Sequence, residues 1–299
     1  MMKIGIALGS GSSRGWSHIG VIKSLKKIGI VPDIVCGTSI GSLVGASFVS
    51  NKLAELEEWI LSLSKFELAK FYNINPTYNG LVNIERVKDY LNKYVTDENL
   101  LIENAKIKYA SVATELETGR EIWFKKGNFT EAVLSSISLP GLFQPHRNNN
   151  RWLIDGGVVN PVPVSVCRAL GADIVIAVNL NSDIVGKHFK TLKPTPSPAN
   201  EEENKETNFT NILNQYTDSL FNSKSETIKT PSFFETIAGS INITQDRITK
   251  SRMVGDPPDI LLSPRLSQIG LLDFHRAKEA ITEGENCVQR ASSDLELFF

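Results

Sequence analysis

Apolar and polar positions along the first fifty residues follow the pattern of strands that alternate with helices. Residues 3–8 form a short apolar run, and a loop rich in Gly and Ser separates it from a segment with helical apolar spacing that ends at Gly29. The same order returns at once, with an apolar run at 34–36, small residues at 37–41 and a helical pattern from Leu43. Two successive strand–helix units predict a parallel sheet that is covered by helices.

The next part of the chain continues this mixture of elements. Residues 53–95 have apolar stripes typical of helices, and Asn148-Asn149-Asn150 is typical of the tip of a hairpin. The further strand-like runs are 107–113, 121–124, 151–154 and 174–178. The expected fold class is therefore α/β, with a central, mostly parallel sheet flanked by helices.

The composition changes after residue 180. Residues 181–206 are rich in Pro, Ser, Thr, Asn and Glu, which predicts a loop or disordered insertion, and apolar residues at 209–220 keep the spacing of an amphipathic helix. The later predicted elements are a helix at 233–252, a strand at 260–262 and a helix at 274–288. We divide the chain into a first domain (1–180), an insertion with an amphipathic helix (181–230) and a helical C-terminal extension packed on the core (231–299).

Composition and charge exclude several classes of protein. The chain has 299 residues, 41% of them hydrophobic, and 32 Lys and Arg against 33 Asp and Glu. Extended disorder and binding of nucleic acid through bulk positive charge are therefore excluded, and no nucleic-acid partner is expected. The three cysteines have unrelated spacings, which argues against a disulfide framework or a zinc site and favours a reducing compartment: Cys36, Cys167 and Cys287.

The apolar runs are too short for membrane insertion. None approaches the ~20 residues that cross a bilayer, and the run at 3–8 is too short for the core of a signal peptide. We expect a cytoplasmic protein, with any lipid contact peripheral to the inner face of the membrane. The sequence leaves the oligomeric state undecided.

Two segments match the nucleophile-elbow pattern G-x-S-x-G, at residues 11–15 and 37–41. The bare pattern is weak, because chance produces it in roughly one chain in ten of this length. In the second segment Ser39 lies between a predicted strand and a helix, and Gly37 and Gly41 supply the small residues that a sharp turn needs. The helix N-terminus beneath the serine favours developing negative charge. We assign Ser39 as the nucleophile.

The first glycine-rich loop supplies backbone N–H groups that can point at one anionic oxygen. Its glycines are spread over residues 9–15, and such a loop together with the N–H after the nucleophile builds an oxyanion hole. The candidate donors are the N–H groups of Gly9, Gly11, Ser12 and Ile40. Two alternatives stay open at this point: ordinary strand–helix turns without chemistry, and a dinucleotide site. The dinucleotide site has little support, because the spacing is not G-x-G-x-x-G and Asp33 precedes the second strand instead of ending it.

A base must accept the proton of the serine. None of the four histidines has a convincing context: His18, His146, His188 and His275. Asp155 has the best context among the carboxylates, since it follows a hairpin strand and precedes Gly156 and Gly157, which let the backbone pass close to a neighbouring loop.

Three ordered segments resemble the patatin-like phospholipases, most closely the bacterial branch: residues 8–20 (Leu-Gly-Ser-Gly-Ser-Ser-Arg-Gly, then Trp-Ser-His-Ile-Gly), residues 37–41 (Gly-Thr-Ser-Ile-Gly) and residues 155–157 (Asp-Gly-Gly). The resemblance covers roughly residues 4–180. It implies an α/β fold, hydrolysis of acyl esters of lipids, and a dyad of Ser39 and Asp155 that needs no histidine. The chain departs from the usual run of glycines at Ser10 and Ser12, where a Cβ has to fit.

The resulting hypothesis is a serine acyl hydrolase that forms an acyl-enzyme on Ser39, with a lipid or acyl ester as substrate and neither metal nor organic cofactor. Arg14 either braces the loop, meets a phosphate, or is a solvated cation at the helix start. The motif residues with supporting roles are Arg14, Gly15, Gly37, Gly41, Gly156 and Gly157. The rival hypothesis is a non-catalytic lipid-surface or regulatory protein that uses the helix at 209–220 as its contact.

Overall fold

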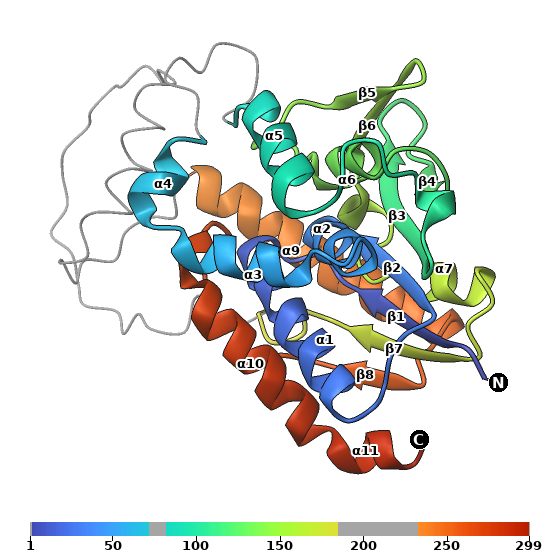
Figure 1. Cartoon of the computed structure of the whole chain (residues 1–299). Helices are drawn as coiled ribbons and strands as arrows, with labels where there is room; N and C mark the ends of the chain where they lie inside the picture. The colour runs from blue at the N-terminus through green and yellow to red at the C-terminus, as the bar shows by residue number, and fades with distance from the viewer. Residues whose placement is uncertain (1, 72–81, 185–232, 299) are drawn as a thin grey trace, which may run out of the picture.

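A mixed sheet forms the centre of the protein in the computed structural model, which describes residues 2–71, 82–184 and 233–298 (Figure 1). In this part of the chain the sheet has eight strands in the order β5-β6-β3-β2-β1-β7-β8, and β4 also pairs with β3. The strands are β1 (Ile4–Leu8), β2 (Ile34–Thr38), β3 (Lys108–Glu115), β4 (Glu121–Phe124), β5 (His146–Asn148), β6 (Arg151–Asp155), β7 (Ile174–Val178) and β8 (Ile260–Leu262). The five neighbouring strands β3-β2-β1-β7-β8 are parallel to one another. The pairs β3–β4, β3–β6 and β5–β6 are antiparallel. The predicted mostly parallel sheet is therefore confirmed.

Helices cover both faces of the sheet. They are α1 (Ser17–Lys27), α2 (Ile40–Val49), α3 (Leu53–Ser62), α4 (Lys65–Ala69), α5 (Ile84–Tyr94), α6 (Phe129–Ile137), α7 (Val164–Ala169), α9 (Phe233–Gly255), α10 (Ala277–Arg290) and α11 (Ser292–Glu296). Helix α10 packs along α1 on one face. The flanking helices predicted from the apolar stripes are confirmed.

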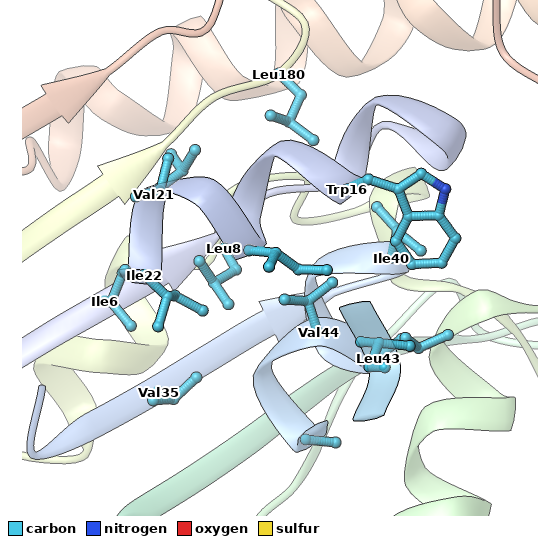
Figure 2. Packing of buried hydrophobic residues seen from close by; sticks show 14 of the residues in the cluster. Ile6, Leu8, Trp16, Val21, Ile22, Val35, Ile40, Leu43, Val44 and Leu180 are labelled. Carbon is cyan, nitrogen blue, oxygen red and sulfur yellow. The ribbon is translucent and has the colours of Figure 1, made fainter. Parts of the chain in front are cut away.

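The two faces of the sheet bury different side chains because strand residues alternate in direction. In β1, Ile6 and Leu8 join the larger core beneath α1 and α2, where Trp16 and Ile40 also pack (Figure 2). Ala7 points to the opposite face and joins a smaller core with residues of α7. Central strands with two buried faces explain why 34–36 and 174–178 are continuously apolar in the sequence.

The C-terminal region contains the predicted strand at 260–262 between two long helices, α9 and α10. Strand β8 pairs in parallel with β7, so residues on both sides of the predicted boundary at 180 share one sheet. Helix α9 runs to Gly255, and the last long helix starts at Ala277 instead of residue 274. The predicted helix at 209–220 and most of the predicted insertion lie outside the described residues.

Candidate active site

Ser39 occupies a sharp turn between β2 and α2. Its backbone has φ 56° and ψ −125°, a left-handed conformation that is costly for a residue with a Cβ. The turn brings backbones so close that a Cβ on Gly41 would lie 2.1 Å from the carbonyl oxygen of Leu8. A Cβ on Gly37 would lie 2.4 Å from the carbonyl oxygen of Gly41. Both glycines are therefore required by the geometry that presents the Ser39 hydroxyl.

Asp155 reaches the same end of the sheet from the antiparallel strand β6. Thr38 pairs with Val112 of β3, and the next residue of β3, Ala113, pairs with Asp155. Strand β3 thus lies between the strand before Ser39 and the strand that ends at Asp155. The two side chains nevertheless contact each other at this end of the sheet. Ser39 Oγ donates a hydrogen bond to Asp155 Oδ2 over 2.5 Å.

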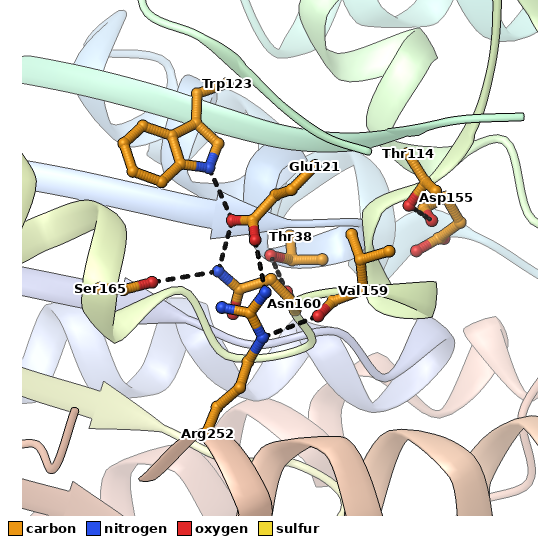
Figure 3. A network of polar contacts seen from close by, with 9 residues as sticks. All are labelled: Thr38, Thr114, Glu121, Trp123, Asp155, Val159, Asn160, Ser165 and Arg252. Carbon is orange, nitrogen blue, oxygen red and sulfur yellow. Dashed lines mark hydrogen bonds and ion pairs between the residues drawn. The ribbon is translucent and has the colours of Figure 1, made fainter. Parts of the chain in front are cut away.

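The carboxylate of Asp155 is buried and held from several directions. Its Oδ1 accepts from the N–H of Gly157 at 2.7 Å. The backbone carbonyl oxygen of Asp155 accepts from Thr114 Oγ1 at 2.9 Å (Figure 3). Burial raises the pKa of Asp155 to about 6, against the lowering effect of the hydrogen bonds from Ser39 and Gly157. A carboxylate with this pKa is a better proton acceptor than an exposed one and is still ionised at neutral pH.

The C-terminal end of helix α6 contacts the backbone of both Ser39 and Asp155. Ser136 Oγ accepts from the N–H of Ser39 at 2.8 Å and donates to the carbonyl of Val112 at 2.6 Å. The carbonyl of Ser138 accepts from the N–H of Asp155 at 2.9 Å. Neither serine is among the residues predicted from the sequence, where the available signal is a run of hydroxyl residues in a largely apolar helix.

The glycine-rich loop is hydrogen-bonded to the sheet at its first residue, and backbone N–H groups later in the loop have no such bond within the described part of the chain. Among the predicted oxyanion donors, the N–H of Gly9 donates to the carbonyl of Val178 at 3.0 Å as a continuation of the sheet. This bond removes Gly9 from the proposed donor set. The N–H groups of Gly11, Ser12 and Ile40 donate to no group among the described residues, and these three residues line the cavity beside Ser39.

Arg14 braces this loop from within the protein. Its side chain is buried, its Nε donates to the carbonyl of Gly11 at 3.1 Å, and its Nη2 donates to Asn242 Oδ1 at 2.9 Å. The interpretation as a solvated cation is therefore wrong.

Ser12 carries the predicted departure from glycine and takes φ 53° despite its Cβ. The remaining motif glycines pack closely, with Gly15 against Ile40 and Gly156 against the carbonyl of Val112.

The other candidate residues have structural contacts. Ser13, the serine of the elbow pattern at 11–15, donates through Oγ to the carbonyl of Gly270 at 2.6 Å. His18 is buried and bonds through Nε2 to the carbonyl of Gly9 at 2.8 Å, and burial lowers its pKa to about 4.

His146 bonds to Glu131 at 2.9 Å. Asp33, considered for a dinucleotide site, accepts from the N–H of Ile4 at 2.9 Å. His188 lies outside the described residues. No group of three or more potential metal ligands occurs in the part of the chain that the structure describes.

An apolar cavity of about 150 Å³ opens at the dyad. Helices α2, α3, α4, α5, α6 and α9 and the loops between them line this cavity. Its aromatic members include Trp59, Phe71, Tyr90, Phe143 and Phe274. The polar groups gather at one end, where Ser39, Asp155 and Gln245 face the same space as the glycine-rich loop. This combination of a long apolar wall and one polar end suits an acyl chain with its ester at the dyad.

Residues 6–168 match the family model of the patatin-like phospholipases, which is more than half of the chain. The chain belongs to the patatin-like phospholipase family. The matched residues include Ser39, Asp155 and the glycine-rich loop of this patatin-like domain. The mixed α/β architecture predicted from the sequence agrees with this membership.

The relatives of this patatin-like chain include bacterial and animal proteins. An uncharacterized NTE family protein of Mycobacterium tuberculosis is 27% identical over 346 residues, which cover 99% of this chain and 92% of that protein. A patatin-like phospholipase domain-containing protein of Caenorhabditis elegans is 34% identical over 189 residues, 60% of this chain and 14% of that protein. Among solved structures, VipD from Legionella pneumophila has a TM-score of 0.44 at 11% identity and covers 98% of this chain and 67% of that one.

No helix within the described residues is both long and apolar enough to span a bilayer.

Proposed function

We propose that this patatin-like chain is a serine hydrolase of lipid acyl esters, of the phospholipase or lysophospholipase kind, and that Ser39 and Asp155 form its catalytic dyad. The observation that carries the proposal is the 2.5 Å hydrogen bond between Ser39 Oγ and Asp155 Oδ2 at the polar end of an apolar cavity. Membership of the family supports a lipid substrate.

In the acylation step, Ser39 Oγ attacks the carbonyl carbon of the ester while its proton passes to Asp155 Oδ2. The carbonyl oxygen becomes an oxyanion, which the N–H groups of Gly11, Ser12 and Ile40 bind. One such donor contributes about 3–4 kcal/mol of stabilisation in the transition state. The tetrahedral intermediate then expels the alcohol, which leaves with the proton held by Asp155, and the acyl group stays on Ser39.

In the deacylation step, water takes the place of the alcohol. The water oxygen attacks the carbonyl carbon of the acyl-enzyme while Asp155 accepts one proton from the water. The same oxyanion donors stabilise the second tetrahedral intermediate. Ser39 leaves with the proton from Asp155, and the fatty acid is released. The two steps use one base and return the dyad to its starting protonation.

The pH dependence of the reaction follows from the pKa of Asp155. The carboxylate must be ionised to accept the serine proton, and its pKa is raised to about 6. We therefore expect kcat/KM to rise with pH, to reach half of its maximum near pH 6 and to level off above it. A profile for a p-nitrophenyl acyl ester from about pH 4 to about pH 9 measures this. A half-maximum near the ordinary value for an aspartate would contradict the raised pKa of Asp155.

Labelling with a fluorophosphonate probe tests the proposed nucleophile directly. We expect the probe to modify the wild-type chain on the peptide that contains Ser39, because an activated serine attacks phosphorus as it attacks an ester carbonyl. Ser39→Ala should remain unlabelled, which mass spectrometry of the digested protein reports. Absence of wild-type labelling, together with lipid binding without turnover, would favour the rival interpretation as a non-catalytic lipid-surface protein.

A further inference from the structure

Helix α9 lies against the proposed active site although it is outside the segment that the family model matches. Three of its side chains reach the site from one side. Asn242 Oδ1 accepts from Arg14, Gln245 contacts the glycine-rich loop, and Arg252 contacts the segment after Asp155. The C-terminal region thus supplies contacts that the patatin-like segment alone lacks.

The Arg252 end of α9 is fixed by a polar network (Figure 3). Arg252 Nε donates to the carbonyl of Val159 at 2.8 Å, and its Nη2 pairs with Glu121 at 2.6 Å. Glu121 also accepts from Asn160 Nδ2, and the carbonyl of Asn160 accepts from Thr38, the residue before Ser39. Because this network and the Asn242 contact hold α9 at separate points, a change of one side chain between them leaves the helix in place.

Gln245 lies between these two anchor points and faces the cavity. Its Oε1 accepts from Ser10 Oγ and from Asn181 Nδ2, each at 3.1 Å. Ser10 directly precedes Gly11, and its N–H is bound to the carbonyl of Pro161. The amide oxygen of Gln245 therefore fixes the side chain of the residue from which the proposed oxyanion donors extend.

The amide nitrogen of Gln245 lies next to Gly157, the residue whose N–H binds the carboxylate of Asp155. A Cβ on Gly157 would lie 2.4 Å from Gln245 Nε2 and 3.0 Å from Asp155 Oδ1, so both polar atoms crowd the same face of Gly157. The N–H of Gly157 donates to that same Oδ1. Among the described residues no acceptor pairs with Nε2. Gln245 thus covers the peptide that holds the carboxylate and presents a hydrogen-bond donor to the site.

We propose that Gln245 is a positioning residue that couples the oxyanion loop to the carboxylate of Asp155. It sets Ser10 through its amide oxygen and confines Gly157 through its amide nitrogen. The inference rests on the proposed function, because it assumes that Ser39 and Asp155 carry the reaction. The acyl chain binds the apolar wall and not Gln245, so the residue should affect the reaction step more than substrate binding.

Gln245→Met tests the proposal because methionine has a similar length and volume but cannot accept from Ser10. We expect kcat for a p-nitrophenyl acyl ester to fall about 10- to 100-fold, since misplacing reacting groups by about 1 Å costs up to that factor. KM should change by less than about 3-fold. The matched control is Thr249→Val, one turn further along α9, where a buried hydroxyl that has no partner in the described part of the chain is replaced by a methyl group. It should retain wild-type kcat.

Ser10→Ala removes the hydrogen bond between Ser10 Oγ and Gln245 Oε1 by changing the donor instead of the acceptor. It provides the test if Gln245→Met does not fold. It should lower kcat in the same way, and the double variant should lose much less than the product of the two single losses. Wild-type kcat in Gln245→Met or in Ser10→Ala would overturn the role of Gln245. A wild-type chain that hydrolyses no acyl ester would instead contradict the proposed function itself, so the two failures are distinguishable.

Discussion

Replacing Ser39 with alanine is expected to lower kcat for acyl-ester hydrolysis by at least about 10³-fold, because the acyl-enzyme cannot form without Oγ. The protein should keep its fold. Alanine removes one hydroxyl and leaves the backbone contact with Ser136 in place. The measurement is initial-rate hydrolysis of a lysophospholipid and a p-nitrophenyl ester by the wild type and the variant, with circular dichroism to compare their folding.

Ser47→Ala provides the matched control for this experiment. Ser47 lies in α2, the helix that follows Ser39, and its buried hydroxyl has no partner among the described residues. Its replacement should leave turnover unchanged. If Ser39→Ala retained wild-type turnover in a folded protein, Ser39 would not be the nucleophile, and the apolar cavity would need another explanation.

Replacing Asp155 with asparagine should lower kcat by about 10²- to 10⁴-fold, the range that a general base contributes. The amide has the same shape, and its oxygen can still accept from the N–H of Gly157. Its nitrogen faces Ser39, however, and can only donate, so it cannot take the serine proton. The fold should persist, because the substitution removes a buried charge. The assay is the same, and the dependence of the rate on pH near pH 6 should disappear with the carboxylate.

His146→Ala is the comparison that separates a dyad from a conventional triad. His146 bonds to Glu131, not to Ser39, and its loss should leave most of the turnover. A folded His146→Ala variant as inactive as Asp155→Asn would mean that the imidazole is the base in the working enzyme.

Several features of this protein could be predicted from short stretches of sequence. The strand runs at 34–36 and 174–178 are apolar because both of their faces are buried. The elbow at Ser39 was predictable because Gly37 and Gly41 act within the same turn, where a Cβ would collide with backbone. The sequence displays such features directly, because burial selects apolar residues and close approach of backbones selects glycine at the positions themselves.

The position of Asp155 as a partner for Ser39 required more than local pattern. The two residues are 116 positions apart, and an aspartate before two glycines is common in turns. The resemblance to the patatin-like phospholipases suggested the pair. In the structure, the antiparallel pairing of β6 with β3 carries Asp155 to the level of Ser39. Strand order and register produce this proximity, and neither follows from apolar periodicity.

The strand–helix alternation, the turn at Ser39 and the glycine-rich loop can be recognised in short stretches of sequence, because burial and close backbone approach restrict which residues can stand there. Which loop N–H groups are free, and which distant elements complete the site, becomes known only from the folded chain. The N–H of Gly9 is bound to Val178 of β7 and is not free. Gln245 contacts the glycine-rich loop although it lies more than 200 positions after Ser39 in the sequence. Each backbone N–H bonds to the acceptor that lies next to it in the folded chain, and that acceptor is often far away in the sequence.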